Sequence, residues 1–302
     1  MAYDKLLVLG VIFSCFCLSS CEKEQLPIID EIVDKYDKYI TEPFSVRRLS
    51  LMSSFGVETF SINAQGMDIY DNRLLFQAGT NQNYIHIIDI NESKALGTIS
   101  FIAPNNESCH MNNINCGTKL NSSDRFPLLY LSQTNKPRSC FVLKISDDAK
   151  TYELVQTIKY VGKSHYLNNS SYDWFIDYSN KFIYSYGHYN GDKNSREIMK
   201  FKLPSLDDEE IAFTDDDILE CFVLGNQSIY QGSRIIDGLL FTPVGYGTAS
   251  SPGRLIVIDL STKEVIHDIP LNCGEPEALG QYKSGAIISS GGKDPRYYYI
   301  HL

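Results

Sequence analysis

Two distant stretches of the chain repeat the same succession of a strand, an aspartate turn and a short apolar strand. The first covers residues 65–76 and the second covers residues 231–241. Their turns are Asp71-Asn72 and Asp237-Gly238, and residues of these types tolerate the left-handed backbone angles of a tight hairpin. Weaker copies occur at residues 126–131, 180–187 and 285–291. The chain is therefore expected to fold from a series of similar antiparallel hairpins.

The hairpins recur at a nearly constant distance along the chain. Counted from one apolar residue in each second strand, the successive spacings are 54, 54, 57 and 47 residues. The residues used for this count are Leu75, Leu129, Ile183, Leu240 and Ile287. A third strand, and usually a fourth, is expected after each of them. Four strands in a unit of roughly fifty residues are typical of a β-propeller blade. A β-sandwich would also give many short strands, but not this regular grouping in fours.

The two ends of the chain complement each other in this repeat. The last unit stops after its third strand, at residues 297–302, and residues 46–52 precede the first complete unit. Those N-terminal residues can supply the missing strand. We therefore predict an all-β fold, a single β-propeller with five blades by the repeat spacing, closed by an N-terminal strand in the last blade. Six blades remain possible, with an irregular sixth in residues 190–228.

The N-terminal segment has the features of an export signal. An apolar run at residues 6–17 follows Lys5, and it is too short to span a bilayer but suits a signal-peptide core. Ser19 and Ser20 precede Cys21, and this pattern resembles the lipobox of bacterial lipoproteins, whose cysteine carries the lipid. We predict a signal peptide in residues 1–20, a lipid-anchored tether in 21–43 and the propeller domain in 44–302. An ordinary secretory signal with a chance cysteine is the alternative.

The lipobox, the aspartate hairpins and an apolar-Asp-apolar third strand together resemble the TolB-like β-propeller lipoproteins of the Gram-negative envelope. The third-strand pattern occurs at residues 87–90 and 257–260, and residues 214–220 resemble a stretch of that group. The resemblance covers most of residues 46–302 and is one of pattern rather than of a specific motif. It implies a fold and an envelope location, since the family is largely uncharacterised. That family is usually six-bladed, which differs from the five units counted here.

Composition excludes some partners. The formal net charge of −10 argues against nucleic-acid binding, which needs a basic face. It also disfavours electrostatic adhesion to anionic lipid, so the lipid on Cys21 is the expected membrane contact. The sequence contains no phosphate-binding loop, nucleophile elbow or zinc-protease helix. We accordingly predict no cofactor and no metal, and we assign no catalytic residue.

The connections between blades indicate a candidate binding site. In a propeller, the segment that leads from an outer strand to the next inner strand passes over one face, near the axis. Amides bind the hydroxyl groups of neutral polyols and sugars, and aromatic rings stack on their C–H faces. Residues of these kinds form a predicted ligand-binding funnel: Gln65, His110, Asn112, His165, Trp174, Gln231, Glu275 and Glu277. The alternative is that polar strand starts simply hold water.

Three functions are compatible with this sequence. We predict a lipid-anchored envelope propeller that acts as a non-catalytic module and binds a glycan, another small polar ligand or an envelope protein. The first alternative is a carbohydrate hydrolase or lyase that uses acids among Asp173, Glu275 and Glu277, which would require two carboxyl groups about 5–9.5 Å apart. The second alternative is a protein scaffold recognised along the blade rim. The outer membrane is the favoured location, and its periplasmic and surface faces both stay open.

Overall fold

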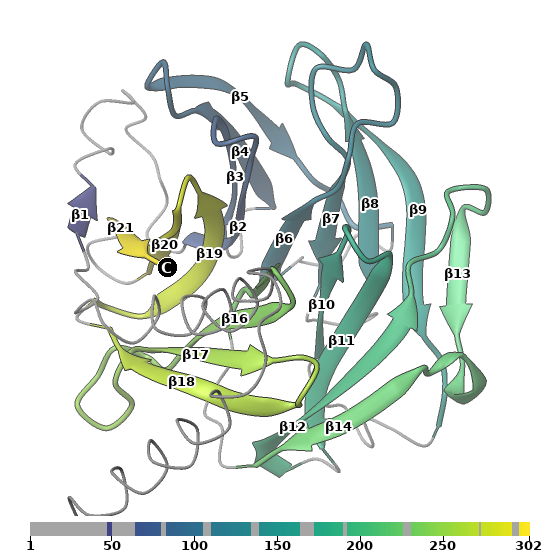
Figure 1. The fold of residues 1–302 in the computed structure, drawn as a ribbon. Coiled ribbons are helices and arrows are strands. Elements are labelled where there is room, and N and C mark those ends of the chain that lie inside the picture. Colours follow the sequence, from purple (N-terminus) through teal and green to yellow (C-terminus); the bar gives the residue numbers. More distant parts are fainter. Residues whose placement is uncertain are drawn as a thin grey trace, which may run out of the picture. The chain divides into compact units, whose positions relative to one another are not determined.

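The computed structural model describes ten stretches of the chain, all within the unit Phe44–Leu302. They are residues 47–49, 64–79, 83–104, 110–133, 139–163, 172–189, 192–225, 231–271, 273–291 and 296–302. Over these residues the fold is a five-bladed β-propeller (Figure 1). None of the helices in the described part of the chain has the length and apolarity to cross a membrane.

Each of the first four blades follows the chain from an inner to an outer strand. Blade 1 contains β2 (Ala64–Tyr70), β3 (Leu74–Gly79), β4 (Tyr84–Asp89) and β5 (Lys94–Ser100). Blade 2 contains β6 (Asn113–Cys116), β7 (Leu129–Ser132), β8 (Cys140–Ile145) and β9 (Tyr152–Tyr160). Blade 3 contains β10 (Tyr172–Asp177), β11 (Phe182–Tyr189), β12 (Asp192–Lys202) and β14 (Glu220–Leu224). Blade 4 contains β15 (Arg234–Ile236), β16 (Leu239–Val244), β17 (Arg254–Asp259) and β18 (Glu264–Pro270).

Blade 5 is built from both ends of the domain. It contains β19 (Pro276–Tyr282), β20 (Gly285–Ser290), β21 (Arg296–His301) and, as its outer strand, β1 (Arg47–Leu49). β1 pairs antiparallel with β21, and Arg48 lies opposite Tyr298. The predicted closure by an N-terminal strand is confirmed. The inner strands contact one another in the order β2, β6, β10, β15, β19 and back to β2, so the ring has no open seam (Figure 1).

The possible sixth blade in residues 190–228 is not formed. β12 and β14 from this segment belong to blade 3, and β13 (Glu210–Phe213) lies between them in sequence. β13 pairs in parallel with β9, the outer strand of blade 2. Two further backbone hydrogen bonds support the two ends of this pairing, from Thr157 N to Glu209 O and from Val161 N to Phe213 O, both 2.8 Å. The extra residues therefore cover a sheet edge, which would otherwise present unpaired backbone groups.

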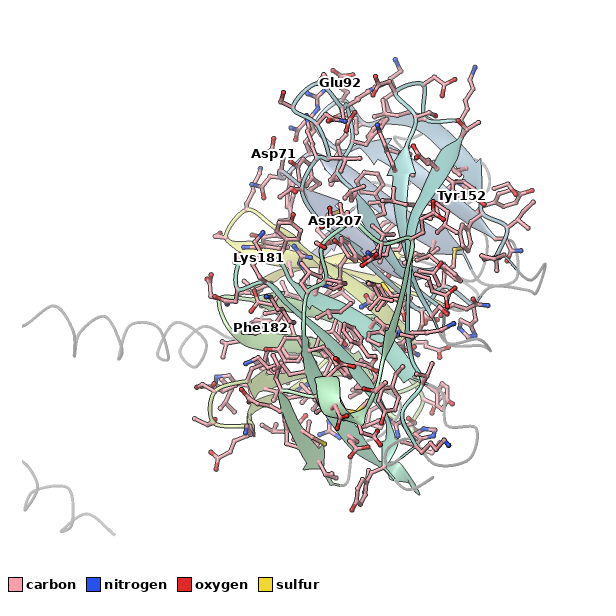
Figure 2. All side chains as sticks on the ribbon, turned by 90° about the vertical axis from the view of Figure 1, so that its right-hand side faces the viewer. Asp71, Glu92, Tyr152, Lys181, Phe182 and Asp207 are labelled. Carbon is pink, nitrogen blue, oxygen red and sulfur yellow. The ribbon has the colours of Figure 1, made fainter. Side chains whose placement is uncertain are left out.

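Aspartate residues explain why the hairpins form where they do. Asp71 and Asn72 have φ angles of 53° and 50° in the turn between β2 and β3, as the sequence pattern predicted. The aspartate that ends the third strand of blade 1 has a different role: the Asp89 carboxylate accepts hydrogen bonds from the backbone N–H groups of Asn91 and Glu92. Such side-chain bonds stabilise a turn locally. In Figure 2, Asp71 and Lys181, both in inner hairpin turns, lie on the same side of the propeller.

The hydrophobic core lies between neighbouring blades. Central strands such as β3 and β17 are buried along almost their whole length, because each sheet is covered on both faces. Phe101 and Phe141 meet between blades 1 and 2 with ring centroids 5.3 Å apart. This arrangement accounts for the continuous apolar runs in the second and third strands. It also leaves the polar residues at the starts of the inner strands to meet near the axis.

Candidate functional site

Six of the predicted funnel residues lie where the inner strands begin. Gln65 is in β2, His110 and Asn112 precede β6, and Gln231 precedes β15. Glu275 and Glu277 lie at the start of β19. Asp173, at the start of β10, belongs to the same level of the structure. All five blades therefore contribute a polar side chain at one end of the inner strands.

Hydrogen bonds join these side chains across three consecutive blades. Gln65 Nε2 of blade 1 donates to Glu277 Oε2 of blade 5 at 2.9 Å. Gln65 Oε1 lies 2.8 Å from His110 Nε2, on the segment that leads into blade 2. The Gln65 amide thus connects a carboxyl group on one side to an imidazole on the other.

A second set of hydrogen bonds joins blades 2, 3 and 4 at the same level. Asn112 Nδ2 donates to Asp173 Oδ2 at 2.6 Å, and Ser132 Oγ donates to Asp173 Oδ1 at 2.8 Å. The Tyr186 hydroxyl, in the same blade as Asp173, donates to the Gln231 carbonyl oxygen at 2.9 Å.

The last connection runs from blade 4 to blade 5, where Gln231 Nε2 donates to Glu275 Oε1 at 3.2 Å. We call the resulting set the polar ring: Gln65, His110, Asn112, Asp173, Gln231, Glu275 and Glu277.

Two Gln-Gly pairs bring the blades close enough for this contact. Gly66 N donates to Met111 O at 2.9 Å, and Gly232 N donates to Glu277 O at 2.7 Å. A Cβ atom at Gly66 would lie 2.7 Å from the backbone of Asn113, and one at Gly232 would lie 2.7 Å from the Asn112 carbonyl oxygen. Only glycine therefore fits where a neighbouring strand approaches this closely. Both glycines lie at the beginning of the two strongest hairpin repeats, where the sequence pattern alone gives no sign of this close approach.

Burial changes the protonation of the acids in the polar ring. The Glu277 side chain is buried, with 4 % of the residue exposed. Its burial and the nearby charge of Glu275 raise its pKa to about 9, against a smaller opposing effect of the Gln65 hydrogen bond. Glu277 is therefore a neutral carboxylic acid at pH 7 and has both a donor and an acceptor.

The other titratable groups of the ring are shifted by burial as well. Burial raises the pKa of Asp173 to about 6, although hydrogen bonds from Ser132 and Asn112 favour its ionised form. Burial also raises the pKa of Glu275 and lowers the pKa of His110. Several acids with raised pKa values in one place are typical of functional sites, because binding and catalysis exploit such shifts.

Further along the inner strands, side chains cross the propeller axis. Arg234 Nη1 lies 2.7 Å from Asp68 Oδ2 and joins blade 4 to blade 1, which are not neighbours. Asp68 is fully buried and also accepts the Cys116 backbone N–H at 2.6 Å. Asn115 of blade 2 donates to the Ser233 carbonyl oxygen, next to blade 4, at 3.2 Å. These contacts were not predicted from the sequence, in which the available signal was a charged residue inside an apolar inner strand.

Trp174 lies apart from the polar ring. Its side chain packs between blades 2 and 3, with 1 % of the residue exposed. Its ring centroid is 6.0 Å from that of Phe201 and 6.3 Å from that of Phe213. Successive residues of a strand point to opposite sides, so Asp173 reaches the ring while Trp174 enters the core. His165 lies outside the described residues.

Within the described ranges, no group of three or more His, Cys, Asp or Glu side chains is arranged to hold a metal ion. The polar ring is accordingly a set of amides, carboxyl groups and one imidazole. Such a set can exchange hydrogen bonds with a hydroxyl-rich molecule or position a proton on a carboxyl group.

Comparison with known proteins supports the fold alone. Neither a protein-family model nor a curated protein matches the chain. Among solved structures, the tail fiber of Staphylococcus aureus phage P68 is similar with a TM-score of 0.58 and 14% sequence identity, over 91% of this chain and 56% of the tail fiber chain. The PQQ-bound aldose sugar dehydrogenase from Streptomyces coelicolor is similar with a TM-score of 0.50 and 12% identity, over 86% of this chain and 98% of that one.

Proposed function

We propose that the polar ring binds a small neutral polyol or sugar and that the protein acts as a non-catalytic binding module. The observation that carries this proposal is the convergence of amide and carboxyl groups from all five blades at one end of the inner strands, where hydrogen bonds join them between neighbouring blades. At pH 7 the polar ring includes a neutral Glu277, which can donate and accept. Hydroxyl groups also donate and accept, so they match such a surface better than a highly charged ligand does.

The degree of exposure indicates where a ligand would make contact. Glu275 and His110 are partly exposed, whereas Gln65, Asn112 and Gln231 are buried. Each side-chain amide has two donor hydrogens and two acceptor lone pairs, and the contacts described above use only some of them. The two partly exposed residues would meet the ligand first, and the buried amides would hold them in position.

The binding proposal is tested with the full chain and a panel of neutral monosaccharides and disaccharides, by thermal shift and then by calorimetry. We expect at least one sugar to raise the melting temperature of the wild type, and Gln231→Ala to abolish that shift. Gln281→Ala is the matched control, because Gln281 is an exposed amide at the far end of β19. A panel without any shift would contradict sugar binding and would favour a protein scaffold recognised along the blade rim.

A second candidate function is a carbohydrate hydrolase or lyase. The raised pKa values of Asp173, Glu275 and Glu277 favour it, because a general acid must hold its proton near the working pH. The two functions differ in the effect of Glu277→Gln, which keeps the shape of the side chain and removes the transferable proton. Turnover of a sugar substrate that disappears in this variant while binding persists would establish the enzyme.

We also propose that the domain is lipid-anchored in a Gram-negative envelope, with the outer membrane as the favoured location. The lipobox-like residues that end at Cys21 and the patterns shared with TolB-like lipoproteins support this location. Both Cys21 and the proposed tether lie outside the described residues. Replacement of the cysteine, Cys21→Ala, is expected to move the protein from the membrane fraction to the soluble fraction. Unchanged membrane retention would contradict the lipid anchor.

A further inference from the structure

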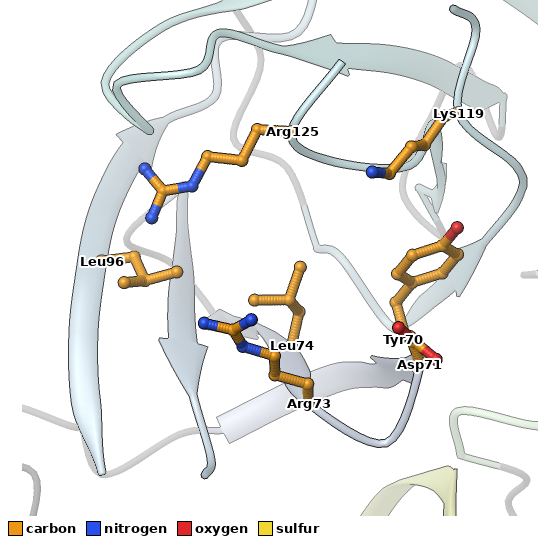
Figure 3. A pocket seen from close by; sticks show the side chains of 7 residues that line it. All are labelled: Tyr70, Asp71, Arg73, Leu74, Leu96, Lys119 and Arg125. Carbon is orange, nitrogen blue, oxygen red and sulfur yellow. The ribbon is translucent and has the colours of Figure 1, made fainter. Parts of the chain in front are cut away.

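A cavity of about 160 Å³ lies between blades 1 and 2, away from the polar ring (Figure 3). Tyr70, which ends β2, is part of its wall. Gln65 of the polar ring lies near the other end of the same strand. A strand advances about 3.3 Å per residue, so roughly 17 Å of strand separates the two sites.

Three basic side chains line this cavity, although the protein as a whole is acidic. They are Arg73, Lys119 and Arg125, and Asp71 is the single acid among the described lining residues. Figure 3 shows the charged ends of all three basic residues around the same hollow. Arg73 is already paired with the buried Asp89, whose Oδ2 lies 2.7 Å from its Nη2. In a chain with a formal net charge of −10, the excess positive charge that attracts anions to this cavity therefore comes from Lys119 and Arg125.

The basic groups keep hydrogen-bond donors that their neighbours do not use. Asp89 accepts from Arg73 Nε at 2.7 Å, and Nη1 of Arg73 has no hydrogen bond to a residue in the described part of the chain. Arg125 Nη1 donates to the Asp147 carbonyl oxygen at 2.9 Å, which leaves its Nη2 without a described partner. Lys119 makes neither an ion pair nor a side-chain hydrogen bond with any described residue. Several donors thus remain for a bound anion.

Besides the three basic residues and Asp71, the cavity wall contains two leucines and a tyrosine. Leu74 and Leu96 lie between the basic groups, and the Tyr70 ring borders the same space (Figure 3). An apolar cavity of about 150 Å³ can bind one benzene molecule, so the volume of this cavity suits a ligand with a single ring. We propose that this cavity binds a small organic carboxylate with an apolar body. The basic side chains would bind the carboxylate, since charge-assisted hydrogen bonds to guanidinium and ammonium groups are strong, and the leucines would pack against the body.

The proposal is tested by titrating benzoate into the full chain in a calorimeter at low salt. We expect saturable binding, and Lys119→Gln and Arg125→Gln should each weaken it about tenfold, which is the loss of about 1.4 kcal/mol from one charged contact. Lys202→Gln is the matched control, because Lys202 is an exposed lysine in blade 3 and its replacement changes the net charge equally. This control should bind benzoate like the wild type.

Neutral and inorganic probes separate the two parts of the proposed ligand. Benzyl alcohol has the ring without the charge, and inorganic phosphate has the charge without the ring, so both should bind more weakly than benzoate. Three outcomes would overturn the proposal: no benzoate binding at low salt, equal weakening by Lys202→Gln and Lys119→Gln, or benzyl alcohol binding as tightly as benzoate. Lys119 is partly exposed and outside the hydrophobic clusters, so Lys119→Gln keeps the test valid if an arginine variant misfolds.

Discussion

The protonated state of Glu277 makes a specific prediction about how stability depends on pH. In the folded protein its pKa is about 9, whereas an unperturbed glutamate has a value of 4.5. Between these values the folded state binds a proton that the unfolded state releases. The stabilising effect of the neutral form is therefore complete below pH 4.5 and is lost as the pH rises toward 9.

The size of the effect follows from the proton difference. One proton changes the free energy of unfolding by about 1.4 kcal/mol per pH unit. Raising the pH from 5 to 8 should therefore lower the free energy of unfolding of the wild type by up to about 4 kcal/mol through the titration of Glu277. Glu277→Gln removes this titration and keeps a donor and an acceptor in the same place. The stability of the variant relative to the wild type should rise by up to that amount over the same pH range.

Urea unfolding at pH 5 and pH 8 measures this difference directly. Trp174 is the single tryptophan of the sequence and is buried in the core between blades 2 and 3, so its fluorescence reports the unfolding of the propeller. Asp173 and Glu275 are present in both proteins, and their own titrations cancel in the comparison. Glu264→Gln, at an exposed position at the start of β18, is the matched control. A difference between Glu277→Gln and wild type that stays constant from pH 5 to pH 8 would refute the buried neutral acid.

Three further predictions concern the architecture. Arg234→Met should lower the free energy of unfolding by about 3–5 kcal/mol, because it leaves the buried Asp68 carboxylate without its cation. Urea titration measures this loss, and the second substitution Asp68→Asn should recover part of it. A loss below about 1 kcal/mol would contradict the argument. Gly232→Ala should lower the free energy of unfolding by about 1–3 kcal/mol through overpacking. Gly225→Ala, where a Cβ atom would meet nothing within 4 Å, should lower it much less. Calorimetric melting compares the two variants, and equal losses of stability would contradict the close approach of the backbones at Gly232. Arg48→Pro, in the middle of β1, should lower the melting temperature because it interrupts the pairing with β21, and an unchanged value would show that closure by β1 adds little stability.

The blade pattern could be predicted from the sequence because it depends on short-range chemistry. Leu75, Leu129, Ile183, Leu240 and Ile287 all lie in second strands of blades, as their spacing predicted. Aspartate turns such as Asp71-Asn72 fix the hairpins through backbone angles that neighbouring residues determine. The closure of blade 5 was also predictable, since a missing strand at one end matched a spare strand at the other.

The strand pairing of residues 192–225 could not be predicted from the sequence. Its strands have the composition of an additional blade, but β13 joins blade 2 and β14 joins blade 3. Strand propensity and turn residues do not specify which sheet edge a strand will pair with. That choice depends on which edge lies within reach after the blades have packed, and this is a property of the whole ring.

The sequence by itself determined the recurring hairpins, the positions of the aspartate turns and the polar character of the inner strand starts. The tertiary structure alone decided that Gln65 meets Glu277, that Asp68 meets Arg234 across the axis, and that Trp174 enters the core while Asp173 faces the polar ring. It also decided the raised pKa of Glu277, which follows from burial. The physical reason is that turns and alternation arise between neighbours in the chain, whereas burial and these pairings arise only when distant blades close into a ring.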